Sequence, residues 1–288
     1  MRLTTIRTPA GTRAARVDGD RAVELEAPDV GALLAAGDDA RRDAAAARGP
    51  EHDLARADLA PVVPRPPKII CLGLNYEQHI REMGHEPPDV PTLFAKYTRA
   101  LIGPRDPIVL PRAAQLVDWE AELAFVIGRI VRHADDGAAR DAIAGYTICN
   151  DVSMRDWQGR TSQWLQGKTF ERSTPVGPVL VSPDELDDPG DLALRCEVDG
   201  VVRQDARTSD LVFDPVAIVR YVSTILTLEP GDLVSTGTPG GVGAGLDPPV
   251  FLRPGQVVRT VVEGIGELAN PCVTEPDDRP QDRAQPTR

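Results

Sequence analysis

Lysine and aromatic residues are scarce in this 288-residue sequence. Aromatic side chains make up 4% of the chain, and only three of its 32 basic residues are lysine, at positions 68, 96 and 168. Where arginine is the usual cation, a lysine can mark a site that needs a compact, titratable ammonium group. The 44 acidic residues leave a net charge of -12. This charge argues against nucleic acid or an anionic membrane surface as a partner, because both need a basic face.

Long apolar runs and closely spaced cysteines are also absent. No apolar run approaches the roughly 20 residues that a membrane-spanning helix needs, and residues 1–20 lack the apolar core of an export signal. The four cysteines include no C-x-x-C pair, so we expect free thiols in a reducing cytoplasm. A small anionic substrate is still compatible with the net charge, because a local group of cations or a metal can reverse the field inside a cleft.

Glycine and proline are plentiful, at 25 and 27 residues, and they indicate many turns and hence a β-rich fold. The Ala-rich residues 30–49 predict one or two helices, and residues 213–228 carry apolar side chains at the spacing of an amphipathic helix. A proline-dense linker and a polar C-terminal segment divide the chain into three parts. These are a small N-terminal domain at 1–62, a main domain at 63–274 and a disordered tail at 275–288.

A strand followed by a short helix is expected just after the linker. Residues 69–74 are apolar, as in a buried strand. Asn75 can cap a helix over residues 76–83, with Gln78 at the capping-box position and Gly84 at the helix stop.

This helix carries an imidazole and a carboxylate three residues apart, His79 and Glu82, so their side chains can touch. A carboxylate beside an imidazole fixes its tautomer and raises its basicity, as a general base requires. An ordinary surface pair has the same spacing, so the pattern alone leaves both interpretations open.

Two carboxylates stand at the head of an apolar run in residues 118–128, DWEAELAFVIG. Alternate residues of a strand share one face, about 6.6 Å apart, so Glu120 and Glu122 repel each other unless water or a shared cation relieves the repulsion. A solvated sheet face would supply the water. A third acid, Asp151, stands at the end of another apolar strand at 146–152. Three carboxylates without histidine or thiolate form an oxygen site suited to Mg²⁺ or Mn²⁺, and Ca²⁺ also fits.

Cationic and amide groups follow the third acid closely. Arg155, Gln158 and Lys168 can neutralise an anionic substrate held at such a metal, although a solvated helix and loop would have the same composition. The Gly-rich residues 235–243 lack a Walker lysine and a G-x-G-x-x-G motif. They predict a tight loop where the Thr238 hydroxyl approaches a ligand.

Taken in order, these motifs resemble the fumarylacetoacetate hydrolase family, and in particular its short bacterial members. The resemblance covers about residues 66–273. The matching motifs are N-Y-x-x-H-x-x-E at 75–82, D-W-E-x-E-L at 118–123, N-D-V-S-x-R-D-x-Q at 150–158, G-K-T-F at 167–170 and G-T-P-x-G-V-G at 237–243.

The resemblance implies an α+β, mostly β fold: a mixed β-sandwich roll with peripheral helices, preceded by a small N-terminal domain and assembled as a homodimer. It also implies a role for each candidate residue. The metal-binding acids would be Glu120, Glu122 and Asp151; the catalytic residues His79 and Glu82, on a lid, with Lys168; and the substrate-binding residues Arg155, Gln158 and Thr238.

The activity implied is metal-dependent hydrolysis of a C–C bond in a β-diketo acid such as an acylpyruvate or fumarylpyruvate. The dyad would activate water, and the lysine would stabilise the enolate that leaves. Decarboxylation of oxaloacetate, or isomerisation or hydration of a dienoic 2-oxo acid, would use the same enolate, so the motifs leave these alternatives open. An inactive dimeric binding protein is the non-enzymatic alternative, and the presence of acids, dyad and lysine together argues against it.

Overall fold

The computed structural model describes residues 1–82 and 86–276, with the backbone alone for His79 and Glu82. A large mixed sheet runs through the molecule in the order β4-β3-β2-β1-β13-β11-β10-β16-β5-β6, and β7 pairs with β13. Its strands are β1 (Arg2–Thr8), β2 (Gly11–Asp18), β3 (Arg21–Glu24), β4 (Glu51–Asp53), β5 (Ile69–Gly73), β6 (Thr92–Ala95), β7 (Leu101–Ile102), β10 (Ala121–Ile127), β11 (Ile143–Asn150), β13 (Thr174–Val181) and β16 (Leu233–Ser235).

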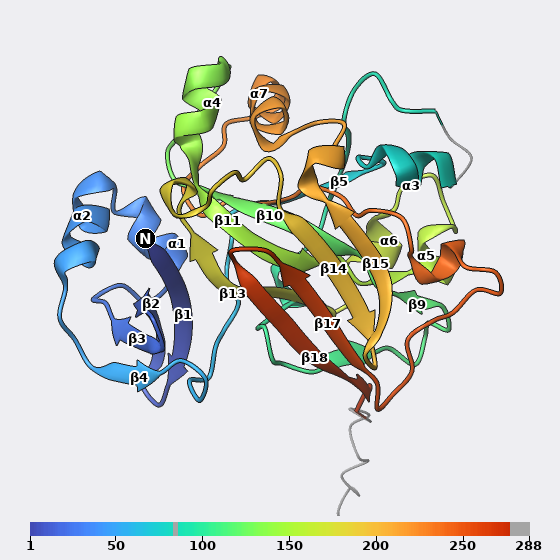
Figure 1. The fold of residues 1–288 in the computed structure, drawn as a ribbon, viewed down its shortest axis with the longest axis horizontal. Coiled ribbons are helices and arrows are strands. Elements are labelled where there is room, and N and C mark those ends of the chain that lie inside the picture. The colour runs from blue at the N-terminus through green and yellow to red at the C-terminus, as the bar shows by residue number, and fades with distance from the viewer. Residues whose placement is uncertain (83–85, 277–288) are drawn as a thin grey trace, which may run out of the picture.

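A five-stranded sheet in the order β15-β14-β17-β18-β8 lies across the centre of the large sheet (Figure 1). A separate pair joins β9 to β12. These strands are β8 (Ile108–Leu110), β9 (Val117–Asp118), β12 (Ser153–Met154), β14 (Ala193–Val198), β15 (Val201–Arg207), β17 (Val257–Val262) and β18 (Gly266–Thr274). The predicted mostly β fold with mixed sheets is confirmed.

The helices are short and lie around the sheets (Figure 1). The α-helices are α1 (Val30–Ala35), α2 (Asp38–Ala46), α3 (Glu77–Glu82), α4 (Asp136–Ala142), α5 (Arg155–Gln158), α6 (Leu165–Lys168) and α7 (Pro215–Ile225). The 3₁₀ turns are η1 (Thr98–Ala100), η2 (Pro183–Glu185), η3 (Thr208–Asp210) and η4 (Gly243–Gly245). In the described ranges, no helix is long and apolar enough to cross a membrane.

Two helical regions predicted from the sequence are confirmed. The Ala-rich segment forms α1 and α2, and the amphipathic segment forms α7. Asp29 and Asp214 cap α1 and α7, because each carboxylate accepts a hydrogen bond from a free amide in the first turn. The apolar face of α7 buries Ile218, Val219 and Val222.

The N-terminal segment continues the large sheet. β1 pairs antiparallel with β13, with Leu3 opposite Leu180, and α1 and α2 pack beside β1–β3 (Figure 1). The division at residues 62 and 63 stays a prediction, and most of the predicted tail lies outside the described residues.

Asn75 does not cap α3, which begins at Glu77. Its amide donates to the carbonyls of Phe213 and Thr236, at 3.0 and 2.7 Å, and its oxygen accepts from the Phe213 amide at 2.8 Å. A buried amide gains more by satisfying three backbone groups than by capping one short helix. The predicted helix stop at Gly84 lies outside the described residues.

Strand β10 positions the candidate site because both of its faces are buried. One cluster, shared with the five-stranded sheet, takes Trp119, Ala121, Leu123, Phe125 and Ile127. A second cluster, shared with α1 and the linker, takes Ala124 and Val126. Alternate residues of β10 thus pack into a different cluster on each face, as the geometry of a strand requires. This packing gives Glu120 and Glu122, at the start of the strand, a rigid support.

Two isoleucines near the end of β10 give a matched pair of core and surface variants. Ile127 is fully buried, whereas Ile130 is 73% exposed. Ile127→Ala should lower the free energy of unfolding by about 2–5 kcal/mol because it leaves a cavity. Ile130→Ala should change it by less than about 0.5 kcal/mol. Urea denaturation of both variants measures the difference, and equal effects would contradict the burial of β10.

Candidate metal and substrate site

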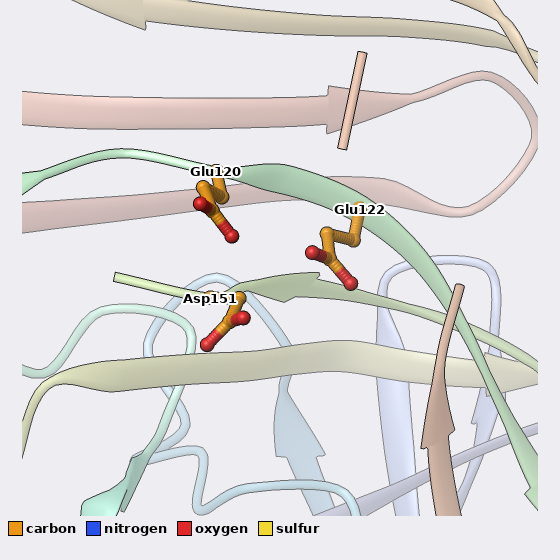
Figure 2. A group of neighbouring side chains, drawn as sticks. All are labelled: Glu120, Glu122 and Asp151. Carbon is orange, nitrogen blue, oxygen red and sulfur yellow. The ribbon is translucent and has the colours of Figure 1, made fainter. Parts of the chain in front are cut away.

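Three carboxylates meet where β10 and β11 run side by side. Asp151 follows β11, and its amide bonds to the Glu120 carbonyl at 2.8 Å. Oxygen atoms of Glu120, Glu122 and Asp151 lie within 4.8 Å of one another, and all three residues are buried. Figure 2 shows Glu120 and Glu122 extending toward Asp151. Burial excludes the solvated sheet face as an explanation for this acid pair.

Glu122 supplies the test of whether a cation fits. Its Oε2 atom accepts hydrogen bonds from the Ser235 hydroxyl and, at 2.9 Å, from the Gly237 amide. Its Oε1 atom is buried and has no hydrogen-bond partner among the described residues. Burial, followed by the charges of Asp151 and Glu120, raises the pKa of Glu122 well above its usual value. An unpartnered oxygen among three carboxylates fits a hard divalent cation.

Lys168 and Arg155 neutralise part of this charge. Lys168 Nζ lies 2.5 Å from Glu120 Oε2 and 2.8 Å from Asp151 Oδ2. Arg155 Nη1 lies 2.6 Å from Glu120 Oε1. Burial lowers the pKa of each cation, but the neighbouring carboxylates outweigh it, so both pKa values lie above their usual range. Both groups therefore stay charged at neutral pH.

Lys96 also belongs to this group of buried charges, although no motif in the sequence assigns it a role. It follows β6, is 3% exposed, and donates to Asp151 Oδ1. Asp151 is thus held through both oxygens, one by each of two buried lysines. The only sequence signal for Lys96 was the scarcity of lysine, since no motif includes it.

Asp118 is a second residue whose role the sequence did not reveal. Its Oδ1 accepts the Gly243 amide at 2.7 Å, and its Oδ2 accepts the Ala244 amide at 3.0 Å and Arg155 Nε at 2.8 Å. The Trp119 indole donates to the Gly241 carbonyl at 3.1 Å. Asp118, which ends β9, and Trp119, which follows it, therefore hold both the Arg155 guanidinium and the Gly-rich loop.

The predicted substrate-binding residues line one cavity of about 330 Å³ beside the acids. Arg155 Nη2 is buried without a hydrogen-bond partner in the described structure. Gln158 accepts from Arg155 Nη1 at 2.9 Å, and the Thr238 hydroxyl donates to the Ala121 carbonyl at 2.9 Å. The cavity wall comprises Leu72, Gly73, Leu74, Glu120, Arg155, Gln158, Gly159, Thr161, Trp164, Lys168, Thr238, Val242 and Ala244.

His79 and Glu82 belong to α3, but their side chains lie outside the described residues. Their pairing as a water-activating dyad stays a prediction. The structure brings the other seven candidate residues together around the acids and the cavity, and their individual roles also stay predictions.

The fold and the site define a β-rich protein with a buried acid cluster suited to a divalent cation beside a small-molecule cavity. Residues 68–273 match the family described as fumarylacetoacetate (FAA) hydrolase C-terminal. The chain belongs to the fumarylacetoacetate hydrolase family, as its motifs predicted.

Relatives of the chain include named enzymes. It is 44% identical over 227 residues, 77% of this chain and 71% of the relative, to a protein named oxaloacetate tautomerase, mitochondrial, from Xenopus laevis. A putative HpcE protein from Mycobacterium smegmatis has a TM-score of 0.88 at 36% identity, covering 96% of this chain and all of that one. A 5-carboxymethyl-2-hydroxymuconate delta-isomerase from the same species has a TM-score of 0.79 at 38% identity, with the same coverage.

The unpartnered Glu122 oxygen predicts that binding of a metal and removal of the Glu122 charge each stabilise the protein. Mg²⁺ or Mn²⁺ should raise the melting temperature of the wild type, because a ligand that binds only the folded state stabilises it. Glu122→Gln should remove that rise. It should also raise the melting temperature of the metal-free protein at pH 7, where keeping this carboxylate ionised opposes folding.

The pH dependence of the metal-free protein follows from the same shift. A carboxyl group with a raised folded-state pKa favours folding below its unfolded pKa, and that contribution is lost as pH rises through the folded value. The advantage of Glu122→Gln should therefore shrink as pH falls from 7 toward the ordinary glutamate pKa. Thermal melts with EDTA or metal test this, with Glu51→Gln at an exposed position as control. A wild type indifferent to metal would contradict a cation site.

Proposed function

We propose that the protein is a metal-dependent enzyme that enolises a small 2-oxo acid, and that keto–enol tautomerisation of oxaloacetate is its best-supported reaction. The observation that carries the proposal is the buried Glu122 oxygen without a partner, placed among three carboxylates. The similarity to a protein named oxaloacetate tautomerase supports the choice of substrate.

Charge balance in the site favours an anionic substrate once a divalent cation is present. Three buried carboxylates, those of Asp118, Glu120 and Asp151, pair with the three cations Lys96, Arg155 and Lys168. The buried carboxylate of Glu122 is the fourth, beside Glu120 and Asp151. Fully ionised, this group carries one net negative charge, which a divalent cation would reverse. A cation bound there would also polarise the 2-oxo group of the substrate.

The residues of the chain supply binding and charge stabilisation. Arg155 has an unpartnered Nη2 at the cavity and can bind the carboxylate of the substrate through its fork of donors. Gln158 holds the guanidinium in place. Lys168 stays protonated and can donate to the oxygen that becomes negative when the keto form loses a proton.

The size of the cavity favours a short substrate. Ligand pockets usually span about 300–1,000 Å³, and this one, at about 330 Å³, lies at the lower end. A four- or five-carbon acid is the size expected, and oxaloacetate has four carbons. Its decarboxylation would pass through the same charged oxygen and need no attacking water.

Hydrolysis of a C–C bond is the second candidate function. It is favoured by the His79–Glu82 spacing on α3, which suits activation of a water molecule. It is also supported by the similarity, at 32% identity and a TM-score of 0.86, to a fumarylacetoacetate hydrolase from Exiguobacterium antarcticum. The delta-isomerase neighbour supports testing a dienoic 2-oxo acid as well.

Lys168 is the residue whose loss should most directly slow enolisation. Conversion of enol-oxaloacetate to the keto form should depend on Mg²⁺ or Mn²⁺ and stop with EDTA. Lys168→Met should lower kcat by about 10²–10³-fold, as loss of one donor to a developing negative charge does. Lys68→Met is the matched control, since Lys68 pairs with Glu229 and Asp232 outside the cavity. An unchanged kcat in Lys168→Met would contradict the proposed role.

His79 separates hydrolysis from reactions that need no attacking water. His79→Ala should lower hydrolysis of an acylpyruvate by about 10²–10⁴-fold, the usual contribution of a general base. Oxaloacetate decarboxylation should be retained in the same variant. His133→Ala, at an exposed position, is the control. Unchanged hydrolysis in His79→Ala would show that the dyad does not activate water.

A further inference from the structure

Trp164 is the largest apolar side chain among the residues that line the cavity. It stands at the N-terminus of α6, four residues before Lys168, and both side chains line the cavity. Residues four apart in a helix lie on the same face, slightly more than one turn or about 6 Å apart along the axis. The indole and the ammonium group assigned to the reacting oxygen therefore come from positions about one helical turn apart and line the same cavity.

Two neighbouring strands hold the indole in place. A Cβ atom added to Gly73, the last residue of β5, would lie 2.2 Å from the Trp164 Cζ3 atom. The ring thus packs directly against bare backbone. On β6, the Phe94 ring packs edge-on against the indole, with centroids 5.6 Å apart and planes at 72°. The indole has backbone on one side and an aromatic ring on another, and these two contacts restrict its rotation.

Phe94 also links the wall to the charged end of the cavity. Lys168 Nζ lies 5.0 Å from the centroid of the Phe94 ring. The Phe94 ring therefore contacts both the Trp164 indole and the Lys168 ammonium group. The three side chains form one packed cluster, which is apolar at Trp164 and charged at Lys168. The other apolar residues of the wall are aliphatic and smaller.

We propose that Trp164 sets the maximum length of the substituent on the 2-oxo acid, so that the protein accepts compact 2-oxo acids and excludes long-chain ones. This inference rests on the proposed function, because it places the 2-oxo acid group at Lys168 and Arg155. The remainder of the substrate then extends along the cavity wall to which the indole belongs. Trp164 is a specificity-determining residue here and takes no part in the bond changes.

Unreactive oxamates allow substrate length to be tested apart from turnover. They keep the planar 2-oxo carboxylate group, and the N-substituent takes the position of the substrate chain. Calorimetry on the full-length, Mn²⁺-loaded protein should show that the wild type binds N-methyl oxamate at least ten-fold more tightly than N-butyl oxamate. Trp164→Ala should remove or reverse this preference, since methylenes admitted to an apolar pocket contribute about 10–200-fold each. Trp164→Phe should give an intermediate preference.

Trp157→Ala is the matched control. Trp157 lies in the same region but packs on Phe170, with ring centroids 5.3 Å apart, and does not line the described cavity. Its loss should leave the N-methyl preference unchanged. Because each variant is judged by the ratio of two affinities, a general loss of binding does not hide the result.

The outcomes separate this inference from the proposed function. If the wild type binds N-methyl oxamate but Trp164→Ala keeps its preference, the inference is overturned and the proposed function stands. The inference is also overturned if Trp157→Ala shifts the preference as much as Trp164→Ala. If the metal-loaded wild type neither binds an oxamate nor converts oxaloacetate, the proposed function and the inference fall together.

Discussion

The rest of the site depends on one constraint: four carboxylates are kept out of water in the middle of a β fold. Removing a charge from water costs several kcal/mol unless partners compensate it. Here Lys96 and Lys168 hold Asp151, and Lys168 and Arg155 hold Glu120. Glu122 receives only neutral donors on one oxygen, and its other oxygen has none in the described structure. The compensation is therefore incomplete at one defined atom.

The positions of these carboxylates are fixed by β10, the strand that follows Glu120, because a strand packed on both faces cannot shift without disturbing the core. β10 is buried on both faces, and its register with β11 places Ala121 opposite Asn150. Asp118, one residue before the buried Trp119, extends this rigidity to Arg155 and to the Gly-rich loop. The acids, the guanidinium and the loop consequently share one support. A second shared support lies across the cavity, where Trp164 stands at the N-cap of α6 and Lys168 at its end, and both side chains contact Phe94.

Much of the fold and of the acid cluster could be predicted from local patterns. The E-x-E spacing fixes a common face in any strand, and an acid at the end of a second apolar strand points to the same sheet edge. The role of Lys96 could not be predicted, because it reaches Asp151 over a sequence separation of 55 residues and no motif links them. The prediction that Asn75 caps a helix was wrong for a similar reason. Its position in the sequence suits a cap, but its side chain bonds to Phe213 and Thr236, which are remote in the chain.

By itself, the sequence determined the class of protein, the strands that carry the acids and the kinds of group that surround them. These three features depend on residue type and on spacing over a few residues, and both can be seen in the periodicity and the order of the motifs. Only the tertiary structure decided which oxygen lacks a partner in the described residues, which lysine holds which carboxylate, and that the Trp164 indole lines the same cavity as Lys168. Hydrogen bonding, desolvation and packing against backbone depend on distances between segments remote in the chain, and no local pattern encodes them.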